Sequence, residues 1–301
     1  MNVTRQQRKL QLGTHDRARV GVRFPKDCYA PIVYRRIVII ELLLPDIGCI
    51  CEGGDGDSLN SFDWGKSENI VMFRAVVFDI GQTLVDYKKP MNWSKLYRPA
   101  FEQIAAKYHY HFSEAHYQNA GDVLTKYNTR INPRDHEVSS AQIFTEILQG
   151  MDISVEDMEQ VKESFYTYFR QDCSLFPDVE PTLKRFSGKG IKLATLSDVA
   201  YGMDNIYALA DIASVIRYID YPFTSNDTGY RKSCTKGLEI LCDKMRINRS
   251  DVVFVGDEEK DMACAKNTGA YGVLINRDGA LKDYGQDRTI HTLAELFLLF
   301  T

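Results

Sequence analysis

The sequence predicts an α/β protein with a doubly wound parallel sheet and an all-helical insert after its first strand. From residue 176 onward, short apolar runs alternate with segments of helical character, as in a parallel sheet covered on both faces. Residues 89–175, in contrast, show helical patterns only. They follow an apolar run, FRAVVFD at 73–79, that indicates a buried strand ending on a carboxylate.

The first 71 residues differ in composition from the rest. Residues 1–36 carry nine Lys or Arg against two Asp, and residues 37–71 carry seven acids against one Lys. No helical or strand period persists there, so we expect a poorly ordered extension outside the fold. Met72 stands directly before the first strand and is a candidate true start of the protein. A basic arm that binds nucleic acid is the alternative.

The insert is predicted from serine caps and helical periodicity. Helices are expected at 94–110, 113–129, 139–150 and, after a capping box at Ser154 and Asp157, up to residue 170. Beyond Phe176, helices are expected at 181–190, 200–210, 235–246 and 258–268, and strands at 191–196, 213–216, 252–255 and 272–275. This predicts a core of residues 72–88 and 176–301 and a helical cap of residues 89–175.

Composition excludes several classes of protein. The chain has 301 residues, 44% of them hydrophobic, and a formal net charge of −4, which argues against nucleic acid as the main partner of the folded part. Seven scattered cysteines form no C-x-x-C pair, so reduced thiols in a cytoplasmic protein are expected. The longest apolar run, 37–44, is too short to span a membrane. Oligomeric state is not predicted.

Three apolar strands end on polar residues, Asp79, Ser197 and Asp257. Because the carboxyl ends of parallel strands meet at one edge of a sheet, we expect these side chains to lie together, with Lys232 in reach from a loop. Two neighbouring carboxylates need a compensating charge, and oxygen ligands favour magnesium. Each residue taken singly has a structural alternative that is about equally plausible. Ser197 would cap the helix that follows it, Lys232 would be a surface charge and Asp261 would form a local ion pair.

Residues in other positions are interpreted as structural. We expect Glu258 to Lys260 at the surface. Arg130 and Arg134 are expected in a solvated loop of the insert, with contact to an anionic substrate as the alternative.

Four motifs in order carry a resemblance to a known family. D-x-D-x-T matches 79–83 with Gly81 in place of the second Asp, and a strand-closing Ser matches Ser197. G-x-x-K-P matches 229–233 with Ser in place of Pro, and G-D-x-x-x-D matches 256–261. From Met72 to the C-terminus the sequence resembles the haloacid dehalogenase-like hydrolase superfamily, which implies a Rossmann-like core with a helical cap.

The resemblance implies roles for these residues. Asp79 is expected to be the nucleophile that forms an aspartyl-phosphate. Ser197, Lys232 and the backbone amides of Ile80 and Gly81 are expected to bind the phosphoryl group, and Thr83 to hold the loop in shape. A magnesium ion is expected to be bound by four groups: the carboxylates of Asp79, Asp257 and Asp261 and the backbone carbonyl of Gly81.

Gly81 is the departure with the largest consequence. Phosphatases of the superfamily carry there the Asp that protonates the leaving group, a contribution of about 10²–10⁴-fold in rate. Four interpretations remain: another acid such as Asp86 or one from the insert; an easily lost leaving group; cleavage of carbon–halogen or carbon–phosphorus bonds; or a weakly active or inactive phosphate-ligand-binding protein. The retained Asp257 and Asp261 favour a magnesium-dependent phosphatase of a small phosphorylated metabolite.

Overall fold

The computed structural model describes residues 72–88, 93–232 and 234–300. All of them lie in the compact unit Ser67–Thr301. The N-terminal extension, residues 1–71, lies outside the described residues, so its interpretation stays a prediction. Within the described ranges, no helix combines the length and apolar character needed to cross a bilayer.

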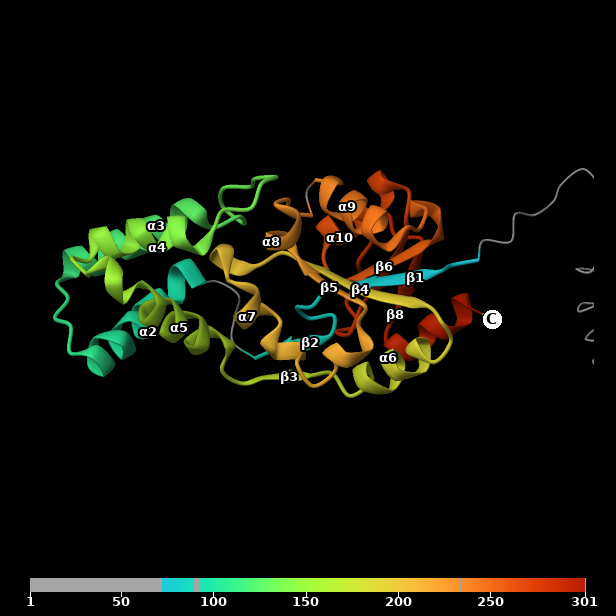
Figure 1. The fold of residues 1–301 in the computed structure, drawn as a ribbon, viewed down its shortest axis with the longest axis horizontal. Coiled ribbons are helices and arrows are strands. Elements are labelled where there is room, and N and C mark those ends of the chain that lie inside the picture. Colours follow the sequence, from blue (N-terminus) through green and yellow to red (C-terminus); the bar gives the residue numbers. More distant parts are fainter. Residues whose placement is uncertain (1–71, 89–92, 233, 301) are drawn as a thin grey trace, which may run out of the picture. The chain divides into compact units, whose positions relative to one another are not determined.

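A six-stranded parallel sheet forms the centre of the core (Figure 1). Its strand order is β5-β4-β1-β6-β7-β8, so the first strand lies in the middle and later strands extend to both sides. The strands are β1 (Ala75–Phe78), β4 (Lys192–Ser197), β5 (Tyr221–Thr224), β6 (Val252–Gly256), β7 (Tyr271–Ile275) and β8 (Arg288–Ile290). Because β4 and β5 lie on one side of β1 and β6, β7 and β8 on the other, the strand order reverses between β1 and β6, and a crevice is expected at their carboxyl ends.

The sheet buries both of its faces, and β1 shows how. Val76 and Phe78 face one core with α6 (Val179–Ser187) and the 3₁₀ segment η6 (Leu293–Leu299). Ala75 and Val77 face a second core with α9 (Lys236–Met245) and α10 (Glu259–Thr268). Strands buried on both faces read as continuous apolar runs, as β1 and β6 do. The predicted doubly wound α/β fold is confirmed.

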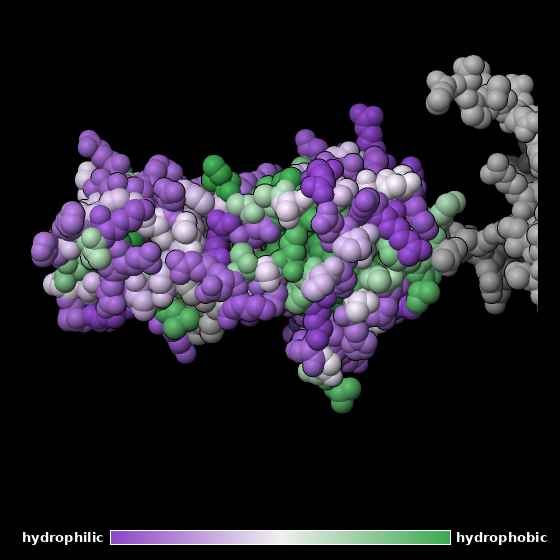
Figure 2. Space-filling view, turned by 90° about the horizontal axis from the view of Figure 1, so that it is seen from below, coloured by the Kyte–Doolittle hydropathy of each residue, from purple (hydrophilic) through white to green (hydrophobic). Residues whose placement is uncertain are grey.

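Four helices form the insert between two short antiparallel strands, β2 (Val85–Tyr87) and β3 (Cys173–Leu175). They are α2 (Trp93–Tyr108), α3 (Glu114–Tyr127), α4 (Ser140–Gly150) and α5 (Met158–Arg170), with η1 (Val155–Asp157) before the last. Phe101, Phe144 and Phe165 are fully buried in a hydrophobic core of their own. The side of the insert that Figure 2 shows is largely hydrophilic, as expected for amphipathic helices.

The predicted helix starts in the insert agree with the observed caps. The side chains of Ser113, Ser139 and Ser154 each accept a hydrogen bond from a backbone N–H in the first turn that follows, at 3.3 Å. Residues 89–175 are not helical throughout, however, since β3 pairs with β2 near the end of this range. A strand of three residues is too short to give a periodic signal.

Two elements of the core differ from the prediction. Residues 213–216 are not a strand; the apolar side chain of Val215 is buried beside a 3₁₀ turn, η4 (Ile216–Tyr218), and the strand follows as β5. The helix expected at 200–210 is divided into η2 (Ala200–Gly202), α7 (Asn205–Ala208) and η3 (Ala210–Ile212). Tyr201 and Gly202 adopt φ values of 52° and 64°, and this left-handed conformation interrupts a right-handed helix.

Candidate active site

Three predicted residues meet at the carboxyl edge of the sheet. Asp79 directly follows β1, Ser197 ends β4 and Asp257 directly follows β6. All three line a cavity of about 120 Å³, together with Ile80 and Gly81. We call this the reaction cavity. The sequence prediction that these strand ends converge is therefore matched by the geometry, while their chemical roles remain to be proposed.

Lys232 lies against Asp79, one of the residues that line this cavity, with only 2% of its own side chain exposed. Its Nζ is 2.5 Å from Asp79 Oδ1 and 2.6 Å from Asp261 Oδ1. Burial alone would lower the pKa of Lys232, but the carboxylates of Asp261 and Asp79 outweigh burial and raise it well above 10.5. The lysine is therefore charged at any physiological pH and is held against both acids.

The loop that carries Lys232 is attached to the insert by main-chain hydrogen bonds. Glu137 N–H donates to the carbonyl of Gly229 at 3.0 Å, and Arg231 N–H donates to the carbonyl of Asp135 at 2.8 Å. Between them, His136 and Tyr230 form an antiparallel bridge. Residues 135–137 and 229–231 thus form a short two-stranded contact that joins insert and core.

Three carboxylates form a group that could hold a cation. One ligand oxygen from each of Asp79, Asp257 and Asp261 lies within 4.8 Å of the other two. Burial, followed by the nearby charges of Asp79 and Asp261, raises the pKa of Asp257 to about 8. Lys232 alone therefore does not offset the negative charge buried here. A divalent cation with a preference for oxygen ligands fits this donor set.

Small residues and short contacts fix this group in place. A Cβ at position 256 would overlap the carboxylate of Asp261, so the close approach of Asp261 to β6 requires Gly256. Thr83 Oγ1 donates to Asp257 Oδ1 at 3.4 Å, and Glu258 N–H donates to Asp261 Oδ2 at 3.0 Å. Thr83 thus orients a candidate metal ligand, beyond the expected role of shaping its own loop.

Gly81 is not required by the local geometry. Its φ is not in the left-handed region, and an added Cβ would meet only the ring of Tyr87, at 3.7 Å. A larger side chain is therefore sterically acceptable at this position. Asp86, the expected substitute for the missing acid, forms an ion pair with Lys88. Among the described residues, Asp86 lines neither the reaction cavity nor the larger cavity beside it.

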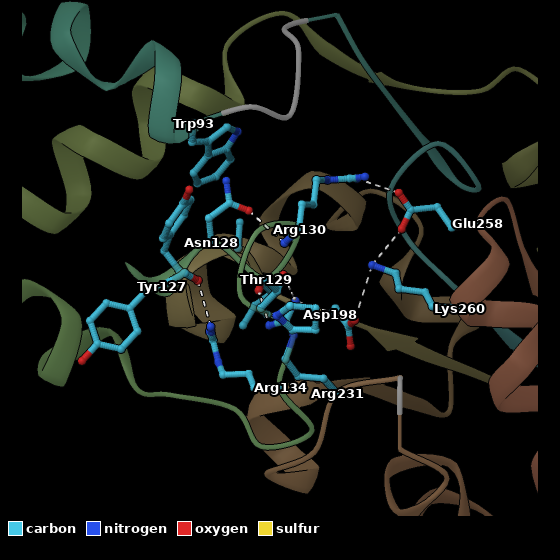
Figure 3. A pocket seen from close by; sticks show the side chains of 14 residues that line it. Trp93, Tyr127, Asn128, Thr129, Arg130, Arg134, Asp198, Arg231, Glu258 and Lys260 are labelled. Atoms are coloured by element: carbon cyan, nitrogen blue, oxygen red, sulfur yellow. Dashed lines mark hydrogen bonds and ion pairs between the residues drawn. The ribbon is translucent and has the colours of Figure 1, made fainter. Parts of the chain in front are cut away.

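A second cavity of about 300 Å³ lies beside the first (Figure 3). We call it the outer cavity. It is lined by Arg130 and Arg134 from the insert and by Glu258 and Lys260 from the core. Arg130, with 62% of its side chain exposed, agrees with the expected solvated loop, and Lys260, 37% exposed, with the expected surface position. The sequence did not predict that these residues line one cavity. One signal in the sequence could have indicated this: Glu258 and Lys260 follow the motif residue Asp257 by only one and three positions.

Asp198 connects the two cavities and is buried. Its Oδ1 accepts from the backbone N–H of Lys232 at 2.9 Å, and its Oδ2 lies 3.4 Å from Lys260 Nζ and 3.6 Å from Arg231 Nη2. Burial would raise the pKa of Asp198, but Arg231, Lys232 and Lys260 together hold it below 3.8. Asp198 is therefore ionised and anchors the loop that carries Lys232.

Relatives of this chain include both phosphatases and dehalogenases. Ribulose-1,5-bisphosphate 5-phosphatase of Halopiger xanaduensis is 26% identical over 241 residues, 75% of this chain and 98% of that protein. (S)-2-haloacid dehalogenase 4A of Burkholderia cepacia is 27% identical over 149 residues, 48% of this chain and 63% of that protein. A 2-haloacid dehalogenase structure from Pseudomonas syringae, 20% identical, has a TM-score of 0.56 and covers 76% of this chain and 98% of its own.

The family itself follows from a match along most of the described core and insert. The model of haloacid dehalogenase-like hydrolases matches residues 73–269, which include all four motifs and the carboxylates of both cavities. The fold and this match agree with the resemblance seen in the sequence. The chain belongs to the haloacid dehalogenase-like hydrolases, and the protein is a hydrolase of that family.

Proposed function

We propose that the protein is a magnesium-dependent phosphohydrolase that acts on a small phosphorylated metabolite through an aspartyl-phosphate on Asp79. The acidic group of Asp79, Asp257 and Asp261 carries this proposal. A nucleophile needs one carboxylate, and the two further carboxylates beside it, partly buried Asp257 and buried Asp261, exceed what the single charge of Lys232 can offset. The phosphatase relative that spans 75% of this chain supports the same choice.

In the proposed reaction, an oxygen of Asp79 attacks phosphorus while the bond from phosphorus to the leaving-group oxygen breaks. The leaving group departs with the electron pair, and water then hydrolyses the aspartyl-phosphate. Lys232, Ser197 and the amides of Ile80 and Gly81 would hold the phosphoryl oxygens as charge develops. Magnesium bound at Asp79, the Gly81 carbonyl, Asp257 and Asp261 would neutralise phosphoryl charge.

Gly81 restricts the leaving group in this proposal. It has no proton to give, and the nearby acids are engaged, since Glu258 pairs with Lys260 and Asp198 lies between Lys260 and Arg231. We therefore infer substrates whose leaving group departs as a stable anion, such as acyl or aryl phosphates. For alkyl phosphates, the missing acid would cost about 10²–10⁴-fold in rate.

The division of labour within the chain is part of the proposal. Residues 72–88 and 176–301 would supply the reacting groups, and residues 89–175 would act as a cap that selects the substrate and excludes water. The contact between residues 135–137 and 229–231 supports such a cap, because it brings the insert beside the loop of Lys232.

A hydrolysis panel tests the proposal. Acetyl phosphate, 4-nitrophenyl phosphate, glucose 6-phosphate and 2-chloropropionate would be offered with magnesium and with EDTA. We expect magnesium-dependent turnover of the first two, at least about 10²-fold slower turnover of glucose 6-phosphate and none of 2-chloropropionate. Asp79→Asn should lose at least about 10³-fold in rate. Asp122→Asn, the same change on the exposed face of α3, is the matched control and should leave turnover intact.

Dehalogenation is the second candidate, because Gly81 lacks the acid of phosphatases and a relative is a haloacid dehalogenase. Release of chloride from 2-chloropropionate in EDTA would replace the phosphatase proposal with this one. Turnover of phosphonoacetaldehyde, without turnover of the phosphate esters or of 2-chloropropionate, would identify carbon–phosphorus cleavage. Binding of phosphate compounds without turnover of any of them would identify a phosphate-ligand-binding protein.

A further inference from the structure

We propose that the outer cavity binds a second anionic group of the substrate through Arg130, so that the natural substrate carries an oxyanion at each end. This inference rests on the proposed function for the reacting end of the substrate. It adds a subsite, a residue and a class of substrate: small metabolites with a transferable phosphoryl group and a distal carboxylate or phosphate.

The two cavities adjoin and share part of their walls. Trp93, Arg130, Asp198, Glu258 and Lys260 line both of them. A substrate whose phosphoryl group lies at Asp79 therefore extends directly into the outer cavity. With about 300 Å³, the outer cavity is at the lower end of the volumes that hold small ligands.

The two cavities differ in their balance of charge. Four carboxylates and three cations line the reaction cavity: Asp79, Asp198, Asp257 and Glu258, with Arg130, Arg170 and Lys260. Four cationic side chains and two carboxylates line the outer cavity: Arg130, Arg134, Arg231 and Lys260, with Asp198 and Glu258. An anionic group gains from the excess of positive charge there, and more so in a partly desolvated cavity.

Most of these cations are held by the protein itself. Arg231 is buried against Glu137, donates to the carbonyl of Val199 at 2.9 Å and approaches Asp198. Lys260 lies between Asp198 and Glu258. Arg134 donates to the carbonyl of Tyr127 at 2.8 Å. These contacts fix the walls of the cavity and leave Arg130 as the side chain best placed to move to a ligand.

Arg130 can change partner at little cost. Its side chain is 62% exposed, and its ion pair with Glu258, at 2.6 Å, is of the solvent-exposed kind that contributes little to stability. When Arg130 turns to a ligand, Glu258 keeps Lys260 at 2.8 Å and is not left unpaired. Figure 3 shows the Arg130 side chain directed at Glu258.

The backbone that carries Arg130 is fixed. Asn128 Oδ1 accepts from Arg130 N–H at 2.9 Å, and Asn128 Nδ2 donates to buried Ser94 Oγ at 2.8 Å. Trp93, stacked on Phe169 with ring centroids 4.3 Å apart, forms an apolar wall. A pre-ordered loop with one adaptable cation can bind an oxyanion without ordering a segment of chain.

Binding of phosphonate probes tests the subsite independently of turnover. The probes are 4-carboxybenzylphosphonate, its isostere 4-carbamoylbenzylphosphonate, in which the distal group is uncharged, and 1,4-xylylenediphosphonate. They are titrated by calorimetry in the presence of magnesium. The natural chain should bind the two probes that carry a distal anionic group about 10- to 100-fold more tightly than the carbamoyl probe. Whichever of the carboxy and diphosphonate probes binds more tightly identifies the distal group.

Variants assign the effect to Arg130. Arg130→Ala should abolish the preference and change binding of the carbamoyl probe by less than about twofold, and Arg130→Lys should restore part of it. Arg217→Ala is the matched control, because Arg217 is 61% exposed, pairs with Glu180 at 2.6 Å and lines neither cavity. This control should keep the full preference of the natural chain.

The outcomes separate this inference from the proposed function. Equal binding of the carboxy and carbamoyl probes, or an equal loss for both in Arg130→Ala, would overturn the subsite even if aryl phosphates are hydrolysed. Discrimination between the probes without magnesium-dependent hydrolysis of any phosphate would retain the subsite and reject the phosphohydrolase.

Discussion

The two adjoining cavities differ in charge and in how the chain builds them. The reaction cavity is formed by residues at strand ends and collects carboxylates around Lys232. The outer cavity is formed by a loop of the insert facing the core and collects cations. One is built on the strand ends of the sheet, whereas the other contains Arg130, a side chain that can exchange its partner. If both proposals hold, the reacting groups and the group that selects the substrate come from separate parts of the chain.

The largest effect is expected at Lys232. Lys232→Met removes the cation that pairs with both Asp79 and Asp261, and turnover should fall by at least about 10³-fold. Without metal, the protein should also lose about 3–5 kcal/mol of stability, because two buried carboxylates lose their partner. Thermal unfolding in EDTA and steady-state assays measure both. An unchanged melting temperature would contradict the charge balance described for the reaction cavity.

Removal of metal should act on the reaction cavity only. In EDTA, turnover should disappear and the melting temperature should fall, because magnesium at 100 times its Kd stabilises the folded state by about 2.7 kcal/mol. Asp257→Asn should make the protein insensitive to EDTA in the same unfolding assay. In both experiments the protein should still bind the carboxy probe more tightly than the carbamoyl probe. Loss of this preference would show that the two cavities are not independent.

Gly81→Asp should sharpen the contrast between leaving groups. The added side chain meets only ordinary contact with Tyr87, so we expect the variant to fold. Activity on glucose 6-phosphate should rise by about 10²-fold, while activity on 4-nitrophenyl phosphate should change by less than about threefold. Gly81→Asn, of the same size but without a transferable proton, is the control. An equal gain in both variants would speak against proton transfer.

The smallest effect is expected for the pair of Arg130 and Glu258. Glu258→Gln keeps a hydrogen-bond acceptor but removes the charge that competes for Arg130. Binding of 4-carboxybenzylphosphonate should tighten about two- to fivefold, in line with the modest strength of exposed ion pairs. Binding of the carbamoyl probe should stay constant. A weaker carboxy complex would instead place Glu258 among the groups that position Arg130.

The sequence predicted the reaction cavity better than the outer one for a physical reason. Apolar runs that end on Asp79, Ser197 and Asp257 specify both a strand and the edge at which it ends, so their convergence follows from topology. Arg130 comes from a loop of a separate helical unit, and no local period relates its position to the sheet. Its proximity to Glu258 is a consequence of tertiary packing alone.

Short elements limited the prediction of the fold in the same way. β5 has four residues, includes Pro222 and lies at an edge of the sheet, so it lacks the apolar signal of β1 and β6. Residues 213–216, which the sequence predicts as a strand, contribute Val215 to the core from a turn. Tyr201 adopts a left-handed conformation that its residue type does not favour, and helical propensity therefore did not indicate the break.

The main-chain contact between residues 135–137 and 229–231 has a consequence for exchange of parts between family members. A foreign insert joined at the two linker strands alone would remove half of this ribbon and release the backbone next to Lys232. Recombination that preserves activity would have to transfer the partner segment along with the helices. The linker strands that bound the insert in the sequence are therefore not sufficient boundaries for an exchange that is meant to keep activity.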